Sequence, residues 1–201
     1  NGSMKDLLGG KGANLAEMTS LGLPVPRGFT ISTEACIEYL NSNRQLSKDL
    51  ELEIFKHLKQ LENKTNKSFN SSSNLLLVSV RSGARSSMPG MMDTILNLGL
   101  NDKNVEVLAK ATKNSAFAYD CYRRLLQMYG DVVYGIDSHY FENYLTHYKS
   151  KNNLIYDQDL TTDDLKEIVK AFKGIYKKVL NKEFPQNPNI QLLEAVKAVF
   201  S

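Results

Sequence analysis

Apolar residues recur with the 3.6-residue period of an α-helix along most of the chain. From residue 47 onward, for example, Leu50, Ile54, Leu58 and Leu61 fall on one helical face, and Ser47 can cap the start of that helix. The period predicts helices over residues 12–21, 34–41, 47 to about 61, 104–113, 115–129, 138–148, 163–180 and 189–200.

Short apolar runs predict three strands, over residues 28–31, 75–80 and 93–100. Residues 63–74 are rich in Ser and Asn, and we expect a mobile linker there. Because only helices are predicted after residue 101, we expect an α/β lobe over residues 1–101, followed by an all-helical stretch. A single continuous α+β domain is the alternative.

Composition excludes several classes of protein. With 25 basic and 22 acidic residues, the net charge of +3 is too small to indicate nucleic-acid binding. No apolar run is long enough to span a membrane, and no signal peptide is recognisable. The two cysteines, Cys36 and Cys121, lie in helical patterns and favour a reducing, cytoplasmic setting, with an organellar address elsewhere in a longer chain left open.

The stretch from Val78 to Thr94 concentrates polar chemistry at the end of a predicted buried strand. It reads Val78-Ser-Val-Arg-Ser-Gly-Ala-Arg-Ser-Ser-Met-Pro-Gly-Met-Met-Asp-Thr94, with no acid before Asp93. Arginine presents a planar fork of donors that suits phosphate oxygens. From these residues alone, a polyanion site and an ordinary loop with solvated arginines are equally good interpretations.

A glycine-rich turn near the start places Lys11 among Gly9, Gly10 and Gly12, just before a predicted helix that Gly22 would end. Free N–H groups at a helix start, with a lysine beside them, attract anions. The spacing is neither that of a P-loop nor that of a dinucleotide fingerprint. By itself, such a turn more often has only a structural role.

Three blocks of this chain together resemble the amino-terminal nucleotide-binding domain of the pyruvate phosphate dikinase family. The blocks are Gly9-Gly-Lys-Gly-Ala-Asn-Leu-Ala-Glu-Met18, Gly22-Leu-Pro-Val-Pro-Arg-Gly-Phe-Thr-Ile31 and residues 78–100. Weaker likeness continues to the end of the chain. The related phosphoenolpyruvate synthases carry an acidic stretch where this chain has residues 83–93.

The resemblance implies a partial ATP-grasp fold of the α+β class, with a three-stranded lobe over residues 1–101. It also implies a helical insertion over 102–187 and a helix over 188–201 that returns to the first lobe. ATP would be the substrate. Lys11 and Arg81 correspond to phosphate-contacting residues of the family, with Arg81 also stabilising the charge of the transferred group. Arg85, Gly90 and Met92 correspond less securely.

The family's reaction converts ATP, pyruvate and phosphate into AMP, phosphoenolpyruvate and pyrophosphate. A second ATP-grasp lobe supplies its Mg²⁺ ligands, and a separate domain carries a phosphorylated histidine. Neither part is recognisable in this sequence, and His139 with Glu142 lacks a third metal ligand. We therefore expect no metal site and no catalysis by this chain alone. The alternative is a non-enzymatic helical module that docks the phosphohistidine domain, for which Arg123 and Arg124 are the candidate contacts.

Overall fold

The computed structural model of the chain describes residues 4–83 and 93–200. The chain divides into two compact units. The first unit comprises residues 1–67, 81–94 and 196–201, and the second comprises residues 68–80 and 95–195. The boundaries expected in this chain near residues 101 and 187 remain predictions.

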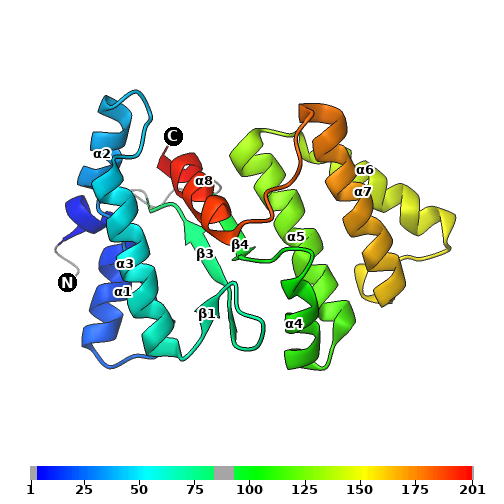
Figure 1. The fold of residues 1–201 in the computed structure, drawn as a ribbon, viewed down its shortest axis with the longest axis horizontal. Helices are drawn as coiled ribbons and strands as arrows, with labels where there is room; N and C mark the ends of the chain where they lie inside the picture. The colour runs from blue at the N-terminus through cyan, green and yellow to red at the C-terminus, as the bar shows by residue number, and fades with distance from the viewer. Residues whose placement is uncertain (1–3, 84–92, 201) are drawn as a thin grey trace. The chain divides into compact units, whose positions relative to one another are not determined.

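Three helices form most of the first unit: α1 (Lys5–Ser20), α2 (Thr33–Asn41) and α3 (Lys48–Thr65), all labelled in Figure 1. The Ser32 hydroxyl oxygen accepts from the N–H of Ala35 at 3.4 Å, and that of Ser47 accepts from Leu50 at 3.2 Å. These side chains cap α2 and α3, because the first N–H groups of a helix have no partner within it. Both predicted helices are confirmed.

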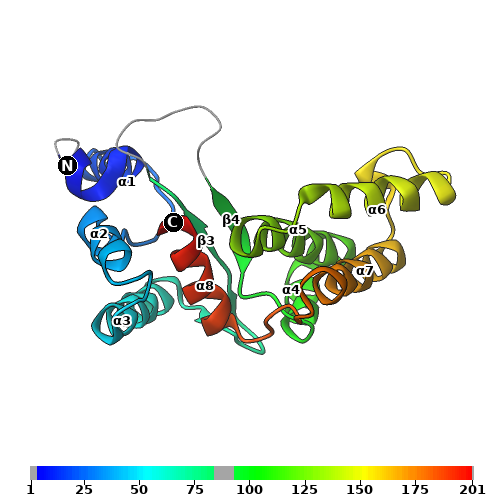
Figure 2. The same cartoon turned by 90° about the horizontal axis from the view of Figure 1, so that it is seen from above.

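The core of the first unit is thin. The predicted apolar face of α3 is buried at Ile54, Leu58 and Leu61. By contrast, the apolar face of α1 leaves Leu15 39% exposed and Met18 40% exposed. Helix α2 lies beside α1, as Figure 2 shows.

The end of the chain contributes to the first unit through Phe200. Its ring centroid lies 5.5 Å from that of Tyr39, and its carbonyl oxygen accepts a 3.6 Å hydrogen bond from the Cys36 thiol. Burial raises the pKa of that thiol. Both cysteines of the chain are free.

In the described part of the chain, two small sheets stand where a three-stranded arrangement was predicted. Strand β1 (Ser68–Phe69) pairs in parallel with β2 (Leu75–Leu76), and β3 (Val78–Arg81) pairs with β4 (Thr94–Leu98). The α+β class is therefore correct, with helices far in excess of strands.

Three details of the strand prediction are wrong. Residues 28–31 pair with no strand in the described part of the chain, and an apolar run becomes a strand only where another backbone satisfies its N–H and C=O groups. The supposed linker over residues 63–74 contains the end of α3 and all of β1. The run over 75–80 is two strands, interrupted at Leu77.

Helices dominate the second unit, and α5 and α7 run side by side in both Figure 1 and Figure 2. The helical elements are α4 (Asn104–Thr112), α5 (Ser115–Tyr134), α6 (Ser138–Lys151), the 3₁₀ turn η1 (Asp157–Asp159), α7 (Thr162–Leu180) and α8 (Pro188–Phe200), whose last residues belong to the first unit. A reciprocal capping box joins Thr161 and Asp164 at the start of α7.

Aromatic rings fill the core of the second unit. The centroids of Phe141 and Phe172 lie 4.9 Å apart in an edge-to-face arrangement. Helix α5 continues past the predicted residue 129 to Tyr134. Within it, Gly130 leaves room for Phe141, whose Cζ would be 2.8 Å from a Cβ at that position. The buried Gln191 amide accepts from the Gly99 N–H and donates to the carbonyl oxygen of Leu100, both at 2.9 Å.

Candidate functional site

Helix α1 is interrupted at Gly9. Its φ of 70° and ψ of 163° are not helical, so a new helical segment begins at Gly10. The first turn of that segment contains Lys11 and Gly12. Because the first N–H groups of a helix have no partner within it and carry partial positive charge, this start can receive an anion.

The interrupted turn lies directly against the end of β3. A Cβ at Gly9 would stand 2.4 Å from the carbonyl oxygen of Gly83, which is closer than atoms can approach. A Cβ at Gly83 would lie 4.0 Å from the Cβ of Lys11. Gly83 follows Arg81 by two residues, so the structure brings the lysine turn next to the strand end that carries the arginine.

A third segment meets the same turn. A Cβ at Gly12 would lie 3.2 Å from Cγ2 of Thr30, in the extended stretch between α1 and α2. Gly9, Gly12, Thr30 and Gly83 all belong to the first unit. The two glycine-containing blocks and the start of the strand-end stretch, far apart in sequence, therefore meet around one turn.

The two basic side chains of this turn and strand end differ in their exposure. Lys11 is half-buried, whereas Arg81 is exposed. Within residues 4–83 and 93–200, neither forms an ion pair, including with Glu17 or Asp93. The Ser82 N–H donates to the carbonyl oxygen of Asp93 at 3.0 Å, which joins the described ends on either side of residues 84–92.

Three further predicted contacts, Arg85, Gly90 and Met92, lie outside the described residues. Two further positions, Gly83 and Thr30, shape the turn, and neither was among the predicted site residues. Gly83 lies in a stretch whose arginines drew the prediction, and Thr30 lies in residues that were predicted to form a strand. A glycine two residues after a strand-end arginine is the one feature of the sequence that could have pointed to the close approach.

The adjacent arginines Arg123 and Arg124 have separate environments in the second unit. The guanidinium of Arg123 is only 6% exposed and binds Asp120 Oδ1 through Nη2 at 2.7 Å and through Nε at 2.9 Å. Arg124 is 57% exposed, with its Nε 2.9 Å from Asp120 Oδ2. Of the two, only Arg124 offers a surface for a partner.

Arg123 also stands 3.6 Å from Asp157 Oδ2, and Lys149 Nζ lies 2.7 Å from Oδ1 of the same carboxylate. The hydrogen bond from Lys149, helped by the charge of Arg123, holds the pKa of Asp157 below its usual value. These contacts join η1 to α5 and α6. Their arrangement is that of a structural ion-pair cluster.

Metal ligands do not gather in the described part of the chain. His139 Nδ1 and Glu142 Oε2 lie 3.7 Å apart on the exposed face of α6. Over residues 4–83 and 93–200, no three or more His, Cys, Asp or Glu side chains are grouped so that they could hold an ion. Among the helices described, none is long and apolar enough to cross a membrane.

Comparison with known proteins identifies the family to which these blocks belong. The sequence profile of the family described as pyruvate phosphate dikinase, AMP/ATP-binding domain, matches residues 5–48 and 42–131. The chain belongs to this family. The matched residues include all of α1, the Thr30 segment and the end of β3, and so the three segments that meet at the glycine turn.

Full-length relatives agree with the family match. The chain is 56% identical to pyruvate, phosphate dikinase of Clostridium symbiosum over all 201 residues, which are 23% of that protein. It is 52% identical to the chloroplastic pyruvate, phosphate dikinase of Mesembryanthemum crystallinum over 200 residues, which are 21% of that protein. It is 50% identical to the enzyme of Giardia intestinalis over 196 residues, 98% of this chain and 22% of the relative. The chain thus spans between a fifth and a quarter of the length of these dikinases.

Proposed function

We propose that this chain is the ATP-binding, amino-terminal part of a pyruvate, phosphate dikinase. The parent enzyme would convert ATP, pyruvate and phosphate into AMP, phosphoenolpyruvate and pyrophosphate. Support comes from membership of the AMP/ATP-binding domain family and from identity of 50% or more to three proteins named for this activity. We also propose that the described lobe is part of an ATP-grasp fold, completed by the remainder of the parent chain.

The close approach of Gly9 to Gly83 is the observation that carries the site. It places a helix start and a lysine on one side of the strand end that bears Arg81. Anions bind at helix starts because the free N–H groups and the helix dipole both favour negative charge. An ammonium group about 4 Å from a phosphate oxygen gains about 4 kcal/mol at an effective dielectric constant near 20.

We assign Lys11 to neutralising phosphate charge and Arg81 to binding two phosphate oxygens through its planar fork. Phosphoryl transfer spreads charge over the oxygens of the transferred group, and preorganised cations stabilise that charge. We also assign Arg85, Gly90 and Met92 to this proposed phosphate region. Arg124, rather than the buried Arg123, is the proposed contact for the domain that carries the phosphohistidine.

Magnesium does not fit the described residues, which gather no group of carboxylates around a common point. In the parent enzyme, acidic ligands outside this chain would hold the ion together with the phosphates of ATP. Charge neutralisation by Lys11 and Arg81 alone is incomplete for a triphosphate. We therefore propose that this chain binds ATP weakly and does not turn it over.

Isothermal titration of ATP with Mg²⁺ into the 201-residue chain tests the site. Arg81→Ala should weaken binding about tenfold or more, because a hydrogen bond to a charged group contributes about 1.5–3 kcal/mol. Arg124→Ala is the matched control, since it removes an exposed guanidinium from the second unit. Equal affinity of the native and Arg81→Ala chains would remove Arg81 from the site. Turnover of ATP by the native chain alone would refute the incomplete-site proposal.

A further inference from the structure

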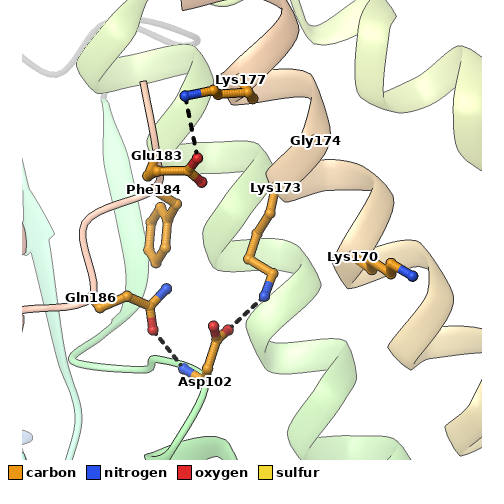
Figure 3. A pocket seen from close by; sticks show the side chains of 8 residues that line it. All are labelled: Asp102, Lys170, Lys173, Gly174, Lys177, Glu183, Phe184 and Gln186. Carbon is orange, nitrogen blue, oxygen red and sulfur yellow. Dashed lines mark hydrogen bonds and ion pairs between the residues drawn. The ribbon is translucent and has the colours of Figure 1, made fainter. Parts of the chain in front are cut away.

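A row of lysines follows one face of α7 in the second unit. Lys166, Lys170, Lys173 and Lys177 are spaced by four, three and four residues, which places them about one turn apart on the same side. The ammonium of Lys166 lies 5.2 Å from the centre of the Tyr119 ring. The other three lysines line an open groove of about 380 Å³, shown in Figure 3.

One large apolar side chain lines this groove among charged and polar ones, and the wall of the groove on α7 is open at one point. The apolar side chain is that of Phe184, which is only 2% exposed. Gly174 lies on α7 between Lys173 and Lys177, and a Cβ there would meet no atom within 4 Å. A side chain from outside can therefore rest against the helix backbone between the lysines.

Two carboxylates lie beside the three lysines, and they differ in how many other contacts hold them in place. Asp102 Oδ1 lies 2.8 Å from Lys173 Nζ and also accepts the Tyr122 hydroxyl at 2.7 Å. The Asp102 N–H donates to Gln186 Oε1 at 2.9 Å, as drawn in Figure 3. These contacts fix Asp102 as part of the groove.

Glu183 is held only loosely. Its carboxylate oxygen lies 3.6 Å from Lys177 Nζ, and the two side chains are 74% and 57% exposed. An exposed pair of this kind contributes little to stability, so an incoming carboxylate can exchange with Glu183 at small cost. Within the described part of the chain, Lys170 has no ion-pair partner.

We propose that this groove, which we call the lysine groove (Lys170, Lys173, Gly174, Lys177 and Phe184), binds an extended acidic segment of a partner protein. Lys170 and Lys177 are about 10 Å apart along the helix axis at a rise of 1.5 Å per residue. Alternate side chains of an extended peptide lie about 6.6 Å apart on one side, so carboxylates at alternate positions can reach successive lysines. Glu183 already shows that a carboxylate is accommodated beside Lys177.

The row favours a peptide over a compact anion, because the lysines follow one another along a helix instead of converging on a point. An apolar side chain between the carboxylates would rest against Gly174, where the helix backbone has open space beside it. The lysine groove lies within the second unit, and its occupant does not depend on the nucleotide proposed for the first unit.

Fluorescence polarisation with a labelled synthetic peptide that carries glutamate at every second position tests the proposal. Lys170→Glu should weaken binding about tenfold, because it replaces attraction by repulsion at the lysine without a partner. Lys178→Glu is the matched control: it makes the same charge change on α7 at an exposed residue outside the groove, and should change affinity by less than about twofold. Glu183→Gln should strengthen binding about threefold by freeing Lys177.

Circular dichroism of each variant verifies folding, and the gain expected for Glu183→Gln cannot arise from misfolding. Several outcomes would overturn the proposal. These are absence of binding, equal loss in Lys170→Glu and Lys178→Glu, and equal affinity for a peptide with its glutamates clustered at one end. Tighter binding of a single-stranded oligonucleotide would also overturn it. So would sedimentation showing that the native chain dimerises and that Lys170→Glu abolishes the dimer, because the occupant would then be a second copy.

Discussion

The two units of this chain stabilise themselves in different ways. The second unit buries large rings, including Tyr129, Phe141, Phe172 and Tyr176, and supplies hydrogen-bond partners for its buried amide at Gln191. The first unit buries few large side chains and leaves leucines and isoleucines on α1 and α2 exposed. Serine side chains cap its helices α2 and α3, and Gly9 packs closely against Gly83.

This difference matters for function because the proposed ATP site lies in the unit with the smaller core. Binding segments often belong to the less stable parts of a protein, where local opening costs little. The turn that carries the lysine packs against its neighbour through glycine backbone. The lysine is therefore held in position although few large side chains are buried beneath it. Three substitutions or conditions test whether the contrast between the units is real.

The largest expected effect is that of Phe172→Ala in the second unit. Phe172 is fully buried against Phe141, and removing a buried aromatic ring costs about 3–5 kcal/mol. Phe117→Ala, at a ring that is 49% exposed, should change stability by no more than about 0.5 kcal/mol. Urea unfolding followed by far-UV circular dichroism measures both, since the chain has no tryptophan.

Hydrogen exchange in the same variant sharpens the comparison. Amides of α5 and α7 should exchange faster in Phe172→Ala, while those of α3 should be unchanged if the first unit is stabilised separately. Equal acceleration in α3 would show that the two units unfold together.

A smaller but more local effect is expected for Gly9→Ala in the first unit. Its positive φ and the Gly83 carbonyl oxygen at 2.4 Å from the added Cβ should together cost about 3 kcal/mol. Gly22→Ala is the matched control, because Gly22 has a φ of +75° with open space around it and should cost only about 1 kcal/mol. Urea unfolding gives both costs. Similar values for the two variants would mean that the contact with β3 is unimportant.

The smallest expected effect is that of low pH on the ion-pair cluster of the second unit. The pKa of the Asp157 carboxyl is lower in the folded chain than its unfolded value of about 3.9. The stabilisation that the Asp157 carboxylate provides is therefore complete above the unfolded pKa, and it disappears as the pH falls through the folded pKa. Asp157→Asn should therefore lower the melting temperature at neutral pH. The further decrease in melting temperature on acidification should be smaller in this variant than in the native chain. Thermal melts from neutral pH to below about pH 3 measure this. An unchanged acid dependence in Asp157→Asn would exclude the cluster as its cause.

Local chemistry in the sequence was sufficient for most helices. The serine cap of α3 and the glycine that follows the end of α1 are decided within a few residues, and both predictions are confirmed. Periodicity also identified the buried face of α3. Such features depend on backbone groups of the same turn, so neighbours in sequence are enough to determine them.

Packing decided what neighbours in sequence could not. Arg123 and Arg124 are adjacent, yet a rotation of about 100° along α5 buries one in a carboxylate cluster and leaves the other exposed. Strand pairing likewise depended on partners distant in sequence, which is why the run over residues 28–31 failed to become a strand.

The sequence by itself determined the family and most of the helices. Lys11 and Arg81 remain proposed residues of the site. Only the tertiary structure decided that the turn around Lys11 lies against the end of β3, because that approach requires two glycines more than seventy residues apart to share one contact, Gly9 against Gly83. The composition and the hydrophobic periodicity of the sequence do not reveal such a contact, because they describe residues that are neighbours along the chain and not residues that are neighbours in space.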